Sequence, residues 1–189
     1  MNLRAFLLTA FLLSAGQAGA LTVAGSVEGS VPPDLRVAGV VVSPFGQVIQ
    51  EVASVPVTQG RFTLELPSAA PSARAQAVLT PQNVTWPGVI DPVQVSAQAQ
   101  VAELKFFTYR DVNNNGRRDE NEALREVTAQ VRGASLFVVW VNTDVTVTAS
   151  KGFQAPLRRG WNAFLLDVGR VVKVQPFADS TVVTVRVGR

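Results

Sequence analysis

Apolar residues recur at every second position in many short segments of this chain, and this alternation limits what the chain can fold into. The clearest case is residues 61–66, where Phe62, Leu64 and Leu66 alternate with polar residues. Successive side chains of a β-strand point to opposite faces, so these three should share one buried face. Almost no window has apolar residues at helical spacing. The sequence therefore predicts an all-β fold.

The same pattern predicts further strands between turn residues. They are expected at 21–27, 35–42, 47–52, 93–109, 135–142, 144–149, 161–168, 171–175 and 181–187, with 93–109 forming one strand or two joined at a bulge and 122–131 a short helical turn. Asn142-Thr143-Asp144 is typical of a tight hairpin connection, and Val168-Gly169 marks another turn.

Residues 1–20 have the three parts of a secretory signal peptide. Arg4 supplies the charged start, 5–13 an apolar run, and Ala18-Gly19-Ala20 a small-residue cleavage site. The apolar run is shorter than the roughly 20 residues that a bilayer span needs. We therefore expect cleavage after Ala20, a secreted or periplasmic protein, and no transmembrane segment.

The rest of the chain is expected to form an N-terminal β-sandwich over 21–104 and a C-terminal β module over 105–189. The alternative is a single sandwich of about a dozen strands. Either arrangement has to be stabilised by its core, since the sequence contains no cysteine and so no disulfide.

Composition argues against two classes of function. The chain has no histidine, which removes the commonest general base and the Ser-His-Asp and Cys-His arrangements. We therefore expect no enzyme activity and assign no catalytic residue. The 17 basic residues are scattered instead of clustered, so the net charge of +3 does not indicate a nucleic-acid partner.

Residues 111–122 have oxygen-bearing side chains at the spacing that a Ca²⁺ loop requires. With Asp111 as position 1, oxygens fall at positions 3, 5, 9 and 12, and Gly116 occupies the sharp turn at position 6. The predicted ligands are the side chains of Asp111, Asn113, Asn115, Asp119 and Glu122 and the carbonyl of Arg117. A plain polar turn is the alternative, because Asn, Asp and Gly are ordinary turn formers.

The surroundings of the loop predict a structural ion instead of a signalling one. Residues 106–110 are aromatic and β-prone, so a strand should lead into the loop. Position 8 is Arg118, where paired hands carry an aliphatic residue, and there is no second loop. Such a site belongs to the weak extracellular class, with a dissociation constant on the order of 10⁻⁴ to 10⁻³ M.

The pattern D-x-N-x-N-G-x-x-D-x-x-E of 111–122 resembles the calcium loop of B-type repeat domains of bacterial surface proteins. Residues 22–67, with the ending Gly60-Arg61-Phe62-Thr63-Leu64-Glu65-Leu66-Pro67, are similar to carboxypeptidase-regulatory-like modules. These resemblances imply immunoglobulin-like or prealbumin-like β-sandwiches, either one or two packed modules, that act as metal-stiffened spacers or adhesin parts. They also imply the ligand roles given above for the side chains.

Trp86 lies in a Pro-rich segment and is the residue we expect to contact a ligand, because aromatic rings stack on sugar faces. Trp140, within an apolar run, is expected in the core. The sequence thus predicts a non-catalytic β-sandwich protein with one structural calcium, in an envelope-associated binding or scaffolding role. The alternative is an accessory carbohydrate- or protein-binding module. The partner, a protein or glycan at the cell surface, and the oligomeric state are left open.

Overall fold

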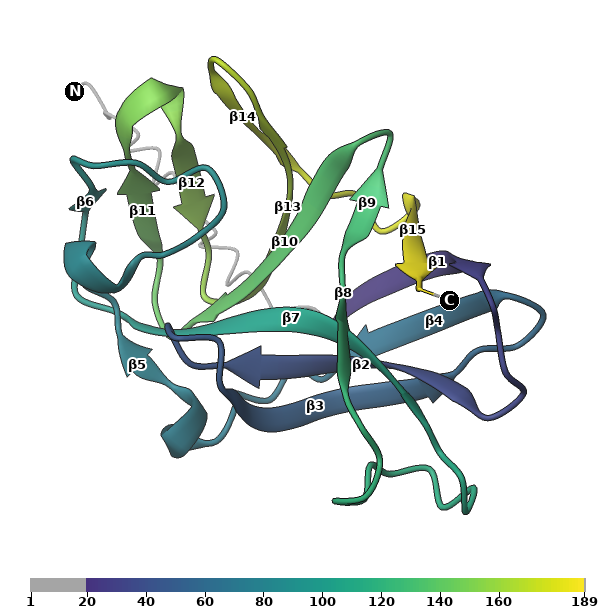
Figure 1. Cartoon of the computed structure of the whole chain (residues 1–189). Coiled ribbons are helices and arrows are strands. Elements are labelled where there is room, and N and C mark those ends of the chain that lie inside the picture. The colour runs from purple at the N-terminus through teal and green to yellow at the C-terminus, as the bar shows by residue number, and fades with distance from the viewer. Residues whose placement is uncertain (1–19, 189) are drawn as a thin grey trace, which may run out of the picture.

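Figure 1 shows the computed structural model of the chain, which describes residues 20–188. The predicted signal peptide lies outside the described residues, apart from Ala20, which is exposed. The described part is all-β, and its only helical elements are three single 3₁₀ turns: η1 (Ala73–Ala75), η2 (Pro81–Asn83) and η3 (Ser150–Gly152). Within residues 20–188 no helix has the length and apolar character needed to cross a bilayer.

Fifteen strands make up this structure. They are β1 (Leu21–Gly29), β2 (Leu35–Val42), β3 (Val48–Pro56), β4 (Arg61–Leu66), β5 (Ala77–Val78), β6 (Gln94–Val95), β7 (Gln100–Arg110), β8 (Arg125–Val127), β9 (Ala129–Val131), β10 (Ala134–Val141), β11 (Val145–Thr148), β12 (Gln154–Leu157), β13 (Gly160–Val168), β14 (Val172–Pro176) and β15 (Val182–Val187).

Twelve of the strands form one sheet, whose main path runs β3-β2-β7-β10-β9-β15-β1-β4. The path curls, because β4 at one end contacts β2 and β3 at the other. The first and last strands, β1 and β15, lie side by side and pair in parallel (Figure 1). On its other side, β1 pairs with β4 in the antiparallel direction. A separate three-stranded sheet has the order β12-β11-β6.

The alternating side chains of β10 enter two hydrophobic cores. Leu136 and Val138 enter the first core, which also contains buried residues of β1, β2, β4, β7 and β15. Phe137, Val139 and Val141 enter the second core, with residues of β11, β12, β13 and β14. Because β10 contributes to both, the two cores lie on opposite faces of one strand.

The domain boundary that we predicted between residues 104 and 105 falls inside β7. This strand pairs with β2 on one side and β10 on the other, so the large sheet continues across that position. The first core also takes Val183 and Val185 from β15, at the far end of the chain. Residues close to both ends of the described chain therefore build the same core.

Several sequence predictions can be compared directly with the strands. The burial alternation of 61–66 is confirmed, with Phe62, Leu64 and Leu66 buried. The helical turn expected within 122–131 was wrong, because these residues contribute β8 and β9, which find partners in β7, β10 and β15.

The tight hairpin expected at Asn142-Thr143-Asp144 was also wrong. These residues connect β10 and β11, which lie in different sheets. The Asn142 side chain instead accepts a hydrogen bond from the backbone of Gln100, and the carboxylate of Asp144 forms an ion pair with Arg158. The side chains of Asn142 and Asp144 therefore stabilise the connection between two sheets instead of a hairpin turn. The turn at Val168-Gly169 is confirmed, since Val168 pairs with Val172 across β13 and β14.

Candidate metal centre

The loop of residues 111–122 lies at the end of an antiparallel pair. β7 ends at Arg110, and β8 returns along it, with Thr108 opposite Arg125 and Phe106 opposite Val127. The connection between them extends beyond the sheet at the lower edge of Figure 1. A strand therefore leads into the loop, as the sequence predicted. Any bond that closes the loop also fixes the spacing of β7 and β8 at this end.

Asp111 holds the first half of the loop together. Its side chain is almost fully buried, with 4% of its surface exposed. Oδ1 accepts a hydrogen bond from the backbone N–H of Asn115 at 3.0 Å, and Oδ2 accepts one from Gly116 at 2.9 Å. The sharp turn of the loop has left-handed backbone at two residues, Asn114 with φ 54° and Gly116 with φ 78°.

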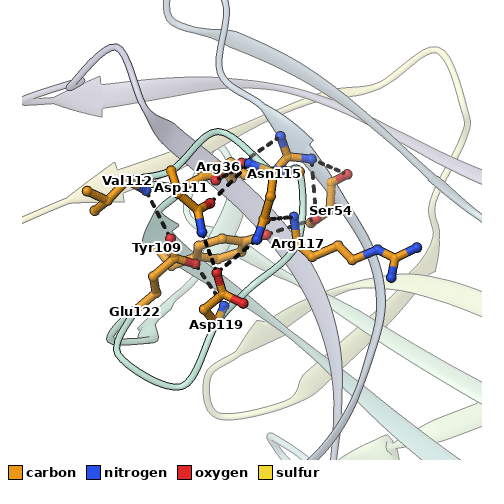
Figure 2. Close-up of polar contacts among 11 residues, drawn as sticks. Arg36, Ser54, Tyr109, Asp111, Val112, Asn115, Arg117, Asp119 and Glu122 are labelled. Atoms are coloured by element: carbon orange, nitrogen blue, oxygen red, sulfur yellow. Dashed lines mark hydrogen bonds and ion pairs between the residues drawn. The ribbon is translucent and has the colours of Figure 1, made fainter.

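Glu122 closes the other half of the loop (Figure 2). It is 4% exposed, and its two carboxylate oxygens accept hydrogen bonds from the backbone N–H groups of Val112 and Asp119, both at 2.9 Å. One side chain thus joins the start of the loop to its last turn. The Nε of Arg118 donates to the carbonyl oxygen of Glu122 at 2.9 Å and adds a second link.

The remaining predicted ligands meet at Asp119. Its Oδ2 accepts hydrogen bonds from the amide nitrogens of Asn113 at 2.7 Å and Asn115 at 2.8 Å. The two amide oxygens accept backbone N–H groups, that of Asn113 from Asn115 and that of Asn115 from Arg117. The NH₂ groups of both amides therefore point toward the carboxylate of Asp119, which is itself a predicted ligand of the cation.

The loop contains the types of ligand atom that Ca²⁺ prefers, but these atoms do not all point toward one common position. Across residues 20–188 no three His, Cys, Asp or Glu side chains gather closely enough to hold a metal ion. The loop does contain five side chains with hard oxygen atoms, the ligands that Ca²⁺ prefers. Binding would require Asn113 and Asn115 to turn their amide oxygens toward Asp119.

A partly buried polar network lies beside the loop and was not predicted from the sequence. Nη1 of Arg36 lies 3.6 Å from Oδ2 of Asp111, and Nη2 donates to the carbonyl and hydroxyl oxygens of Ser54 at 3.1 and 3.4 Å. The hydroxyl of Tyr109 donates to the same Ser54 hydroxyl at 3.1 Å. Burial raises the pKa of Tyr109, although the Ser54 hydrogen bond acts in the opposite direction. Figure 2 shows the network reaching from β2 and β3 to the loop.

The outer side of the loop entrance carries a different ion pair. The guanidinium of Arg110 contacts both carboxylate oxygens of Asp34, and this bond lowers the pKa of Asp34. The carbonyl of Asp34 accepts the backbone N–H of Asp111 at 2.9 Å. Two arginines therefore flank the loop entrance, but Arg36 is directed at the loop and Arg110 is paired outside it.

Trp86, the expected ligand contact, does not present its ring at the surface. It is 4% exposed in the second core, where its ring centroid lies 5.1 Å from that of Phe137. This burial argues against the stacking role that we predicted, because a sugar needs an open aromatic face. Trp140 is 6% exposed, which confirms its predicted place in the core.

Comparisons with known proteins give no match for this chain among family models, curated proteins or solved structures. The site is therefore interpreted from its own residues.

Proposed function

We propose that residues 111–122 bind one Ca²⁺ ion, which clamps the end of the β7–β8 pair. The observation that carries this proposal is the pair of buried carboxylates, Asp111 and Glu122, at the two ends of one loop. Burying an ionised carboxylate is costly unless it is paired or coordinates a metal. Asp111 has one ion pair, with Arg36 at 3.6 Å, and Glu122 has none within the described residues, so Glu122 in particular lacks a counter-charge.

The donor chemistry favours Ca²⁺ over other divalent ions. Six to eight oxygen ligands suit Ca²⁺, whereas Zn²⁺ prefers nitrogen and sulfur, and Mg²⁺ demands a smaller and more regular shell. In the proposed site the side chains of Asp111, Asn113, Asn115, Asp119 and Glu122 and the carbonyl of Arg117 supply the shell. The ion replaces the hydrogen bonds from the amides of Asn113 and Asn115 to Asp119.

The proposed ion is structural. Both ends of the loop leave it as paired strands, so a bound ion resists separation of β7 from β8. The protein that it stiffens is proposed to be a non-catalytic, secreted or periplasmic sandwich of the immunoglobulin-like or prealbumin-like kind. Its role would be envelope-associated scaffolding or binding, with a protein or glycan at the cell surface as partner. The alternative of a carbohydrate-binding module loses its main residue through the burial of Trp86.

Thermal unfolding with and without Ca²⁺ tests the metal site. An ion at ten times its dissociation constant stabilises the folded state by about 1.4 kcal/mol. For a chain of this size that corresponds to a rise in Tm of about 3–6 °C. Chelation should reverse the rise, and Asp111→Ala and Asp119→Ala should abolish it.

Asp167→Ala is the matched control for these variants. Asp167 is an exposed acid on β13, with its carboxylate 3.9 Å from the ammonium group of Lys173. This variant removes the same charge as Asp111→Ala and should keep the full response to Ca²⁺. A melting curve of the unaltered protein that does not move with 10 mM Ca²⁺ would contradict the proposed function.

A further inference from the structure

The first carboxylate of the loop already has a positive charge behind it. The side chain of Arg36 is 13% exposed, and its Nη1 atom lies 3.6 Å from Oδ2 of Asp111. This is the one ion pair that Arg36 makes within residues 20–188. The pair joins β2 to the loop, between residues far apart in the sequence.

The position of Arg36 is fixed by the sheet. Arg36 lies on β2 between Tyr109 of β7 and Pro56 of β3 in the strand register. Its Nη2 atom donates to the carbonyl oxygen and hydroxyl of Ser54. A side chain anchored in this way cannot move into solvent without breaking these bonds. The guanidinium is therefore held near the loop by contacts that do not involve Asp111.

Hydrogen bonding alone does not explain why this arginine is partly buried. The Nε atom of Arg36 is buried and has no hydrogen-bond partner among the described residues. The same is true of Oε2 of Glu51, on the neighbouring strand β3. A buried donor without a partner costs free energy. What the guanidinium gains in return is proximity to the carboxylate of Asp111.

We propose that Arg36 is an internal counter-cation of Asp111 that competes with Ca²⁺ and keeps the calcium affinity of the loop low. The inference rests on the proposed function, because it concerns the regulation of the same site. In the absence of Ca²⁺, the guanidinium compensates the buried carboxylate. When Ca²⁺ binds, the two cations share one carboxylate and repel each other at short range, where protein interiors screen charge weakly.

This proposal predicts two effects of opposite sign for Arg36→Met. The variant should be less stable than the unaltered protein when Ca²⁺ is absent, because Asp111 then has no counter-charge. It should also bind Ca²⁺ more tightly, by about tenfold or more, because the competing charge is gone. A purely structural arginine would lower stability and affinity together.

Isothermal titration calorimetry with CaCl₂, in buffer containing no other divalent ion, measures the affinity. Arg110→Met is the matched control, because it removes the same charge beside the loop from a residue that pairs with Asp34. Its dissociation constant should stay within about threefold of the original, as expected for an exposed charge. Arg36→Lys keeps the charge but loses the forked bonds to Ser54, so it should also bind nearly as weakly as the unaltered protein.

If Arg36→Met does not fold, the unaltered protein still tests the proposal. The side-chain ¹⁵N resonance of Arg36 Nε should shift as Ca²⁺ is added, because the contact with Asp111 weakens. An Nε signal that ignores saturating Ca²⁺, or an Arg36→Met affinity equal to or weaker than the original, would overturn this inference alone. Absence of Ca²⁺ binding in both the original protein and the variant would overturn the proposed function and this inference with it.

Discussion

Replacing Trp86 with alanine should cost much of the stability of this protein. A buried aromatic ring removes about 150–250 Å² from water, which at about 25 cal/mol per Å² corresponds to roughly 4–6 kcal/mol. That range is an upper bound, because unfolded chains already bury part of their surface. Since Trp86 is 4% exposed and packs on Phe137, we expect a loss of about 3–5 kcal/mol in the free energy of unfolding.

Urea denaturation followed by circular dichroism measures this loss in the free energy of unfolding. In thermal unfolding, the Tm should fall by about 6–20 °C. Phe45→Ala is the control, because it also truncates an aromatic side chain but at a position that is 91% exposed. Its effect should stay within about 0.5 kcal/mol. A Trp86→Ala protein as stable as Phe45→Ala would refute the placement of Trp86 in the second core and restore the ring as a surface contact.

Two further substitutions test the first core and the polar part of the sheet. Gly25→Ala should destabilise the protein by about 1–3 kcal/mol, because the new methyl would lie 2.3 Å from Cζ of Phe62; Gly169→Ala, with its nearest neighbour at 3.8 Å, should not. Burial raises the pKa of Glu103, so its contribution to stability is present below the ordinary value of 4.5 and is lost as pH rises through the folded pKa. Glu103→Gln should therefore raise the Tm at pH 7 more than at pH 4; equal changes at both values would contradict the burial of this carboxyl.

Sequence was enough to predict strands that are apolar and bounded by turn residues. The bounds of β2 and β4 agree with the prediction, because Pro and Gly residues flank both segments; β4 buries one face, whereas β2 is buried on both. The short strands β5, β8, β9 and β12 were missed. Two to four residues carry too little periodic pattern, and such strands form because a partner strand is already in place.

The candidate loop could be located because its oxygen-bearing side chains lie within twelve consecutive residues and follow a fixed spacing. Arg36 and Ser54 could not, since nothing near them in the sequence points to a metal site. They reach the loop only because β2 pairs with both β3 and β7. The burial of Trp86 was missed for a related reason, as Phe137 comes from a strand far along the chain.

The parallel pairing of β1 with β15 has a consequence for how the chain reaches its folded state. Val183 and Val185 fill the same core as Val23 and Val27, so the strands made first during synthesis cannot complete their packing until the last ones are available. Contacts between such distant segments require closure of a very long loop, which slows folding. The packing of β1 is therefore completed only after β15 has been made.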